Sequence, residues 1–245
     1  MLVGKRVTKK FGGLTALSEL DFSVEEGQVV GLIGPNGSGK TTLFSVISGL
    51  YKPDGGTITF KGQEISGKKP WTIAKLGIGR TFQITRPFYG LTVLENIMAG
   101  FLYGSESMGN VGVARENTQE ILKFVRLVEK KDSLVTNLTL AERKRLEIGR
   151  TLAIKPDLIL LDEAFAGLNQ VEMNEAVELI KHMRYKLGMT IFIVEHVLKA
   201  IMETCDKVIV IQNGIKIAEG RPFEVVNDSK VIEAYLGVKS SAYNR

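Results

Sequence analysis

The sequence predicts an α/β fold: a core of alternating strands and helices, an N-terminal antiparallel β sub-domain and an inserted helical sub-domain. Three observations support this prediction. β-type runs fill the N-terminal region, strands and helices then alternate, and a stretch with helical periodicity interrupts the alternation. A chain of 245 residues is long enough for one large domain with an insertion. We expect the core in residues 1–85 and 151–245, and the insertion in residues 86–150.

The first part of the core is predicted to be rich in strands. Residues 1–27 are β-rich, and the apolar run Val29–Ile33 is a further strand. A helix follows over Leu43–Leu50. The run Thr57–Phe60 and the turn residues Lys61-Gly62 together predict a hairpin.

Helices are predicted to fill the insertion. One covers Thr92–Phe101, a second covers Ala114–Lys130, and a third starts at Thr139, with a polar loop at Gly104–Gly112. The second has apolar residues at helical spacing, namely Ile121, Leu122, Val125 and Val128. The core resumes at Asp157, where strands and helices alternate again and Asn213-Gly214 favours a type I′ hairpin.

Composition narrows the class of protein. Hydrophobic residues make up 44% and charged residues 24% of the chain, as in soluble globular proteins. No apolar run approaches the ~20 residues that cross a bilayer. The single cysteine, Cys205, excludes an internal disulfide framework and suits a reducing cytosol. The net charge is +5, but the basic clusters contain no aromatic residues on which nucleic-acid bases could stack. We therefore expect no nucleic-acid partner.

A glycine-rich stretch between the strand at Val29–Ile33 and the following helix carries the clearest chemical signal. Strand, glycine loop and helix form the context of a P-loop, in which backbone N–H groups and the helix start surround a phosphate. A chance Gly/Ser-rich turn is the alternative, and the flanking strand and helix argue against it. The residues predicted to bind the nucleotide are Gly34, Pro35, Asn36, Gly37, Ser38, Gly39, Lys40, Thr41 and Thr42. Among them, Lys40 supplies a charge for the β- and γ-phosphates, and Thr41 is placed to ligate Mg²⁺.

Two acidic residues end a second apolar strand. Four apolar residues precede Asp162, so its carboxylate is expected at the carboxyl end of a core strand, where it can hold Mg²⁺. Adjacent strand residues point to opposite faces, so Glu163 can instead polarise the attacking water as general base. An ordinary strand that ends in solvated acids is the alternative. No Asn-Lys-x-Asp motif is present, which argues against a GTPase.

Together these motifs resemble the ATP-binding subunits of ABC transporters, over nearly the whole chain and in the same order. The resemblance implies a P-loop NTPase fold of the ABC ATPase type. It implies that Phe11 stacks on adenine and that His196 senses the γ-phosphate. It also implies that Gln83 contacts Mg²⁺ together with Thr41 and Asp162. From the residues alone, Phe11 could equally have a packing role, and His196 could be a bystander.

The segment that matches the family's signature motif departs from the usual Leu-Ser-Gly-Gly-Gln. In the family this segment contacts the ATP of the opposite subunit, a role that falls here on Thr139, Leu140, Ala141 and Glu142. Side chains at Leu140 and Ala141 would crowd a backbone that must approach phosphate closely. Thr139 and Glu142 also fit a helix capping box, which is an equal interpretation of the pair.

Two further departures concern the same dimer contact. Ala164 replaces the proline that in the family usually follows the two strand-end acids, here Asp162 and Glu163 (the Walker B acids). Asn169 replaces the aspartate that is usual in the family's D-loop, the segment after these acids. This chain's own half-site is therefore complete, whereas the half that it presents to a partner is altered. The resemblance thus favours a heterodimer with a different ATPase subunit over a homodimer.

The resemblance also implies a function. Four stretches are most similar to the subunits of branched-chain amino-acid importers: Gly79–Gln83, Leu91–Asn96, Arg145–Arg150 and Val231–Gly237. The implied protein is an ATPase with ATP and Mg²⁺ as cofactors, peripheral at the cytoplasmic face of the membrane. Its implied partners are transmembrane permease subunits, a second ATPase subunit and, indirectly, a solute-binding protein. Urea and lipopolysaccharide transport ATPases, a soluble ABC ATPase acting on nucleic acid and a P-loop kinase are the alternatives.

Overall fold

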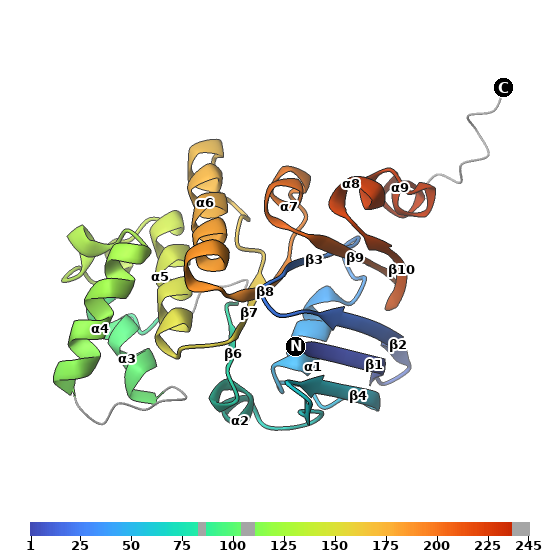
Figure 1. Cartoon of the computed structure of the whole chain (residues 1–245), viewed down its shortest axis with the longest axis horizontal. Helices are drawn as coiled ribbons and strands as arrows, with labels where there is room; N and C mark the ends of the chain where they lie inside the picture. Colours follow the sequence, from blue (N-terminus) through green and yellow to red (C-terminus); the bar gives the residue numbers. More distant parts are fainter. Residues whose placement is uncertain (83–86, 104–110, 237–245) are drawn as a thin grey trace. The chain divides into compact units, whose positions relative to one another are not determined.

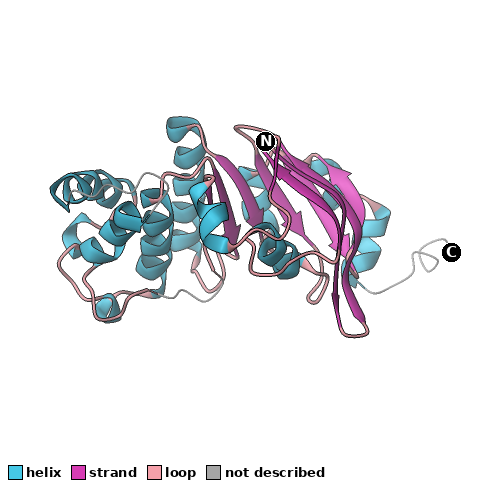
Figure 2. Ribbon diagram, turned by 90° about the horizontal axis from the view of Figure 1, so that it is seen from below, coloured by secondary structure: helices cyan, strands magenta, loops and turns pink. Residues whose placement is uncertain are grey.

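A computed structural model describes residues 1–82, 87–103 and 111–236 of the chain. The chain forms two compact units. Unit 1 comprises Met1–Pro70 and Thr190–Arg245, and unit 2 comprises Trp71–Met189. Figure 1 shows strands from both ends of the chain in unit 1, and Figure 2 shows that the region of α3, α4 and α5 in unit 2 is helical.

Unit 1 contains an antiparallel sheet with the strand order β2-β1-β4-β5. Its strands are β1 (Leu2–Phe11), β2 (Leu14–Val24), β4 (Gly55–Phe60) and β5 (Gln63–Glu64). Leu2 pairs with Val24 on one side and with Phe60 on the other, and all three side chains are buried. The predicted β-rich N-terminus and the hairpin after Phe60 are confirmed.

The second group of strands in unit 1 lies in the order β10-β9-β3-β8, with β3 parallel to both neighbours. These are β3 (Val29–Ile33), β8 (Thr190–Val194), β9 (Lys207–Gln212) and β10 (Ile215–Gly220). Every residue of β3 and β8 is buried, as expected for parallel strands covered on both faces. The helices of this unit are α1 (Lys40–Ile47), α7 (Leu198–Thr204), α8 (Pro222–Val226) and α9 (Ser229–Leu236).

Unit 2 combines a parallel strand pair with a group of helices. The pair is β6 (Ile78–Arg80) and β7 (Leu158–Asp162), and α2 (Pro70–Lys75) precedes it. The longer helices are α3 (Val93–Tyr103), α4 (Val111–Phe124), α5 (Leu140–Ala153) and α6 (Gln170–Leu187). Short 3₁₀ turns at Val128–Lys130 and Val135–Asn137 connect α4 to α5.

Most predicted elements are present, with shifted ends. The helix predicted over Ala114–Lys130 is wrong at its C-terminal end, because α4 stops at Phe124 and Arg126 adopts a positive φ of 56° that no α-helix contains. The type I′ turn is confirmed, since Asn213 and Gly214 both have positive φ, at 50° and 77°. Most of the predicted loop at Gly104–Gly112 lies outside the described residues.

Candidate functional site

The glycine-rich loop joins β3 to α1 in unit 1 and depends on glycine at two close approaches. A Cβ atom at Gly34 would lie 2.0 Å from the Ile211 carbonyl oxygen, and one at Gly39 would lie 2.5 Å from the Ala16 carbonyl oxygen. Both residues also have positive φ, at 154° and 106°. No other residue type fits either position, so the loop is held close against neighbouring backbone.

Polar groups converge inside this loop. Lys40 is only 8% exposed, and its Nζ donates to the carbonyl oxygens of Gly34 at 2.7 Å and of Pro35 at 2.9 Å. The Ser38 hydroxyl is buried and finds no hydrogen-bond partner among the described residues. Among the residues that the structure describes, no side chain caps the start of α1, whose N-cap is Gly39. A buried hydroxyl, an ammonium group and an uncapped helix start together fit a bound phosphate.

The carboxyl end of β7 in unit 2 carries the two predicted acids. Asp162 is 3% exposed, and its Oδ2 accepts a hydrogen bond at 2.9 Å from the buried guanidinium of Arg80. The Asp162 N–H donates to the Thr81 hydroxyl at 3.1 Å. Glu163 has a positive φ of 52°, and its carbonyl oxygen accepts a bond at 2.7 Å from Lys144 Nζ. A non-glycine residue held at positive φ costs on the order of 1 kcal/mol, a strain that clusters at functional sites.

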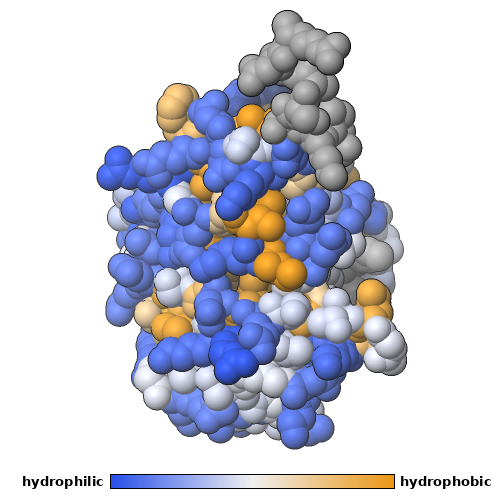
Figure 3. Space-filling view, turned by 90° about the vertical axis from the view of Figure 1, so that its right-hand side faces the viewer, coloured by the Kyte–Doolittle hydropathy of each residue, from blue (hydrophilic) through white to orange (hydrophobic). Residues whose placement is uncertain are grey.

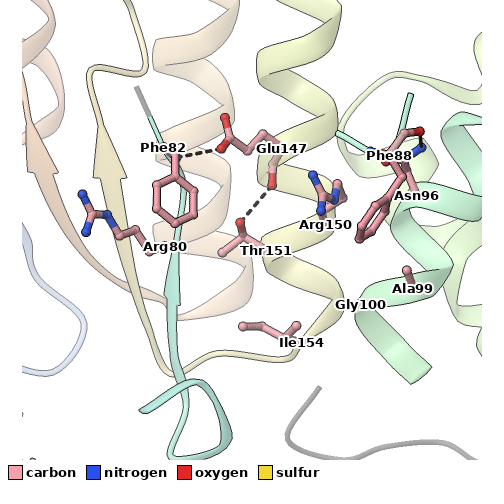
Figure 4. Close-up of a pocket in the computed structure, with 10 residues that line it drawn as sticks. All are labelled: Arg80, Phe82, Phe88, Asn96, Ala99, Gly100, Glu147, Arg150, Thr151 and Ile154. Atoms are coloured by element: carbon pink, nitrogen blue, oxygen red, sulfur yellow. Dashed lines mark hydrogen bonds between the residues drawn. The ribbon is translucent and has the colours of Figure 1, made fainter. Parts of the chain in front are cut away.

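Unit 2 contains a hollow of about 300 Å³, and Arg80, which bonds Asp162, is one of the residues that line it (Figure 4). Phe82 and Phe88, both about half exposed, line it together with α5 residues, and the Arg150 guanidinium lies 4.7 Å from the centre of the Phe88 ring. Glu147 Oε1 accepts a hydrogen bond at 2.7 Å from the Phe82 N–H. The hollow thus combines the aromatic surface of Phe82 and Phe88 with the buried carboxyl group of Glu147 and the guanidinium group of Arg150.

Burial raises the pKa of Glu147 to about 7. The hydrogen bond from the Phe82 N–H and the positive charges of Arg150 and Lys144 lower this pKa, but they only partly offset burial. The negative charge of Asp162 raises it slightly. Burial also lowers the pKa of Arg150. A carboxyl group with a raised pKa binds its proton more tightly in the folded chain than in the unfolded one. Its contribution to stability is therefore full below pH 4.5 and is lost as the pH rises through about 7.

The variant Glu147→Gln is expected to be more stable than the wild type at pH 8, by on the order of 3 kcal/mol, and equally stable near pH 4.5. The amide needs no deprotonation and still accepts the bond from Phe82. Urea unfolding at several pH values measures the difference. Glu178→Gln, an exposed acid on α6, is the control and should follow the wild type throughout. Parallel profiles for Glu147→Gln and the wild type would contradict the assignment.

The remaining predicted residues of unit 1 lie at strand ends. Phe11 ends β1 with its ring 40% exposed, and it contacts Tyr51 edge-on with a centroid distance of 5.1 Å. His196 is exposed just after β8 and lines a second hollow, of about 370 Å³, with Ile33 and Tyr235. The surface on the side of the C-terminal helices shows apolar residues recessed among hydrophilic ones (Figure 3). Helix α9 therefore borders both the strand that leads into the glycine-rich loop and His196.

The segment predicted to contact an opposite subunit begins helix α5. The capping box is confirmed: the Glu142 N–H donates to the Thr139 hydroxyl at 3.2 Å, and the Thr139 N–H donates to the Glu142 carboxylate at 2.8 Å. Ala141 is 7% exposed, whereas Leu140 is 48% exposed. Asn169 caps α6 with the same two-way arrangement. Capping thus accounts for the side chains of Thr139 and Glu142, and their contact with a partner's ATP stays a prediction.

The structure divides the predicted residues between the two units. The glycine-rich loop, Phe11 and His196 belong to unit 1, whereas the strand-end acids and the segment Thr139–Glu142 belong to unit 2. Gln83 lies outside the described residues. No sequence motif assigns a role to Arg80, Lys144 or Glu147, which bond Asp162, Glu163 and Phe82, respectively. The roles of these three residues are seen in their contacts with residues distant in the sequence.

The described residues contain no cluster of three or more His, Cys, Asp or Glu side chains that could hold a metal. A Mg²⁺ ion bound to ATP needs fewer protein ligands, because it keeps waters and phosphate oxygens in its shell. Among the described residues, the structure also contains no helix that is long and apolar enough to span a membrane.

Comparison with known proteins agrees with these observations. Residues 17–166 match the family "ABC transporter", and residues 216–239 match "Branched-chain amino acid ATP-binding cassette transporter". The chain is 37% identical over 240 residues to the high-affinity branched-chain amino acid transport ATP-binding protein LivG of Salmonella typhimurium, covering 93% of this chain and 94% of that protein. It is 36% identical over 243 residues to BraF of Pseudomonas aeruginosa, covering 94% and 95% respectively.

Solved structures give the same result. The ADP conformation of MJ1267, an ATP-binding cassette of an ABC transporter, superposes with a TM-score of 0.87 at 35% identity, covering 97% of this chain and 99% of that one. The cassette MJ0796, solved as a dimer bound to ADP and Pi, gives a TM-score of 0.81 at 26% identity, covering 91% and 99%. The expected α/β fold with its antiparallel and helical sub-domains is confirmed. By family match, sequence identity and fold, the chain belongs to the ABC transporter family as an ATP-hydrolysing cassette.

Proposed function

We propose that this chain powers an ABC importer of branched-chain amino acids. One observation carries the choice of cargo. The C-terminal residues 216–239 match a segment specific to branched-chain amino acid cassettes, and the relatives LivG and BraF, which match over nearly their whole length, serve the same transport. The general ABC family match does not extend to this segment, so it supports the cargo independently of the nucleotide motifs.

In this proposal the glycine-rich loop holds the phosphates of ATP. Lys40 and the Ser38 hydroxyl face the phosphate oxygens, and the exposed ring of Phe11 stacks on adenine. Thr41, Gln83 and Asp162 hold Mg²⁺, which when bound neutralises charge on the phosphates.

Hydrolysis in this proposal needs a base and a sensor of the γ-phosphate. Glu163 takes the proton of the attacking water. Its backbone is held at a positive φ, and the Lys144 ammonium group donates a hydrogen bond to its carbonyl oxygen, so the position of its Cα atom is fixed. His196 donates a hydrogen bond to the γ-phosphate and stabilises the charge that develops there. Glu163 directly follows the buried strand β7, and His196 lies two residues after the buried strand β8, which gives both a rigid support.

The partners follow from the same proposal. A cytoplasmic helix of one permease subunit docks in the hollow of unit 2, where half-exposed Phe82 and Phe88 offer apolar surface and Arg150 offers a positive charge. Phe82, which lines the hollow, directly precedes Gln83 in the sequence, so this proposal couples docking to the nucleotide state. The chain then lies peripherally at the cytoplasmic face of the membrane and meets a solute-binding protein only indirectly, through the permease.

The cargo is tested by transport with the complete complex in proteoliposomes. The chain is purified in detergent together with the permease and second ATPase subunits that copurify with it, and a binding protein is added with leucine or with urea. Leucine is expected to stimulate ATP hydrolysis and to accumulate inside the vesicles. Stimulation by urea alone, or a copurifying partner set without a permease, would contradict the proposal.

The altered signature segment predicts asymmetric pairing. The chain alone is expected to hydrolyse ATP at least about tenfold more slowly than when it is mixed with its partner ATPase, because Leu140 and Glu142 replace the glycine and the neutral glutamine that face a partner's phosphate. Phosphate release at several mixing ratios measures this. The double variant Leu140→Gly with Ala141→Gly should raise the rate of the chain alone. Full-rate hydrolysis by the unaltered homodimer would contradict the heterodimer.

A further inference from the structure

The ring of Phe11, which is proposed to stack on adenine, is held by two neighbours within unit 1. It meets the Tyr51 ring edge-on, with 5.1 Å between the centroids and 77° between the planes. The Lys9 ammonium group lies 5.3 Å from the centre of the same ring. Phe11 stays 40% exposed and Tyr51 44% exposed, so the pair buries little apolar surface. What these contacts fix is the orientation of the Phe11 ring.

Tyr51 is tied to the helix that follows the glycine-rich loop. Helix α1 ends before Gly49, which has a φ of 76°, and the chain turns back there. The Tyr51 N–H then donates to the Ser45 carbonyl oxygen in the last turn of α1, at 3.1 Å. The same helix begins at Lys40, whose ammonium group closes the glycine-rich loop. One rigid helix therefore carries the predicted phosphate-binding lysine at its start and the aromatic neighbour of Phe11 just after its end.

Asp54, which directly precedes β4, holds the end of β1 from a second side. Its Oδ2 accepts a hydrogen bond from the Lys10 N–H at 2.6 Å and pairs with Lys9 Nζ at 3.0 Å. Its own N–H donates to the Thr8 carbonyl oxygen at 2.8 Å. The Lys10 N–H bond, followed by the Lys9 ammonium group, lowers the pKa of Asp54, so the carboxylate is charged at neutral pH. Asp54 thus bonds all three residues that directly precede Phe11.

We propose that the connection Tyr51–Asp54 is a positioning element that holds the Phe11 ring in a fixed place relative to α1 and the glycine-rich loop. It acts through the ring of Tyr51 and through the strand end that Asp54 bonds. A ring that is already held loses less freedom when a base stacks on it, so the connection strengthens ATP binding. The base is bound equally before and during hydrolysis, so the rate of the chemical step is unaffected. The inference rests on the proposed stacking of adenine on Phe11.

The test compares the binding of ATP with that of inorganic tripolyphosphate, which offers phosphates without a base, to the full chain. Tyr51→Leu keeps an apolar side chain but removes the ring. It is expected to weaken ATP binding about three- to tenfold, the range for one lost aromatic pair, and to leave tripolyphosphate binding unchanged. Tyr51→Phe keeps the ring and is expected to stay within about twofold of the wild type for both. Competition against a fluorescent ATP analogue measures both affinities.

Steady-state hydrolysis by the full chain with its partner ATPase gives a second readout. Tyr51→Leu is expected to raise the KM for ATP about three- to tenfold, and Asp54→Ala, which frees the strand end, about two- to fivefold. The kcat should stay unchanged in both, because the lost binding is the same in the ground state and the transition state. Tyr185→Leu, which removes an exposed aromatic ring from α6, is the control and should match the wild type.

Two results would overturn the inference: an unchanged KM for ATP in Tyr51→Leu or in Asp54→Ala, or an equal loss of ATP and tripolyphosphate binding, which would assign the effect to the glycine-rich loop. Phe11→Ala separates this inference from the assignment beneath it. If Phe11→Ala weakens the binding of ATP but not of tripolyphosphate, and Tyr51→Leu changes neither, the positioning role alone is wrong. If Phe11→Ala changes neither, the proposed stacking on Phe11 is wrong.

Discussion

Glu163→Gln is expected to bind ATP with unchanged affinity and to hydrolyse it about 10² to 10⁴ times more slowly than the wild type. The amide keeps the size and hydrogen-bonding shape of the side chain but cannot take a proton from water. Closed dimers should then accumulate with ATP, because the nucleotide that holds the subunits together is not consumed. Phosphate release and gel filtration with Mg·ATP measure the two effects.

A surface acid provides the control for this substitution. Glu178 pairs only weakly with Lys181 on the exposed face of α6, and Glu178→Gln should leave both turnover and dimer formation unchanged. Glu163→Asp is a second comparison, because it keeps the carboxylate but shortens the side chain by one methylene group. Near-normal turnover in Glu163→Gln would remove Glu163 from the role of general base.

Lys40→Ala is expected to lower kcat for ATP hydrolysis by about 10² to 10³ and to weaken ATP binding by about 10- to 100-fold. The substitution removes a charged donor for the phosphates. It also removes the bonds from Nζ to the Gly34 and Pro35 carbonyl oxygens that close the loop. Titration with a fluorescent ATP analogue gives the affinity, and phosphate release gives the rate.

Two variants separate the effect of charge from that of loop geometry. Lys40→Arg keeps the positive charge, but its guanidinium group is planar and larger than the ammonium group of lysine. Because Lys40 is only 8% exposed, the larger group should not fit, and this variant should still lose most of its ATPase activity. Lys199→Ala removes an exposed lysine from α7 and should behave as wild type. Retained ATP affinity in Lys40→Ala would place the phosphates elsewhere.

Local motifs made much of the site predictable. The glycine-rich loop, the two acids at the end of β7 and the histidine after β8 each combine a buried strand with polar residues at or just after its end. Each of these patterns lies within about ten consecutive residues. The capping box at Thr139 and Glu142 is equally local and is confirmed. The predicted end of the helix after Ala114 failed because apolar spacing continues beyond Phe124, whereas the backbone turns at Arg126.

The sequence by itself determined the fold class, the order of the elements and the nucleotide loop, because strand, turn and helix preferences act between near neighbours. Only the tertiary structure revealed that Arg80 holds Asp162, 82 residues away, and that Glu147 holds Phe82, 65 residues away. No spacing rule connects such pairs. A buried charge must find its partner wherever folding places one, and that partner is fixed by how the chain packs.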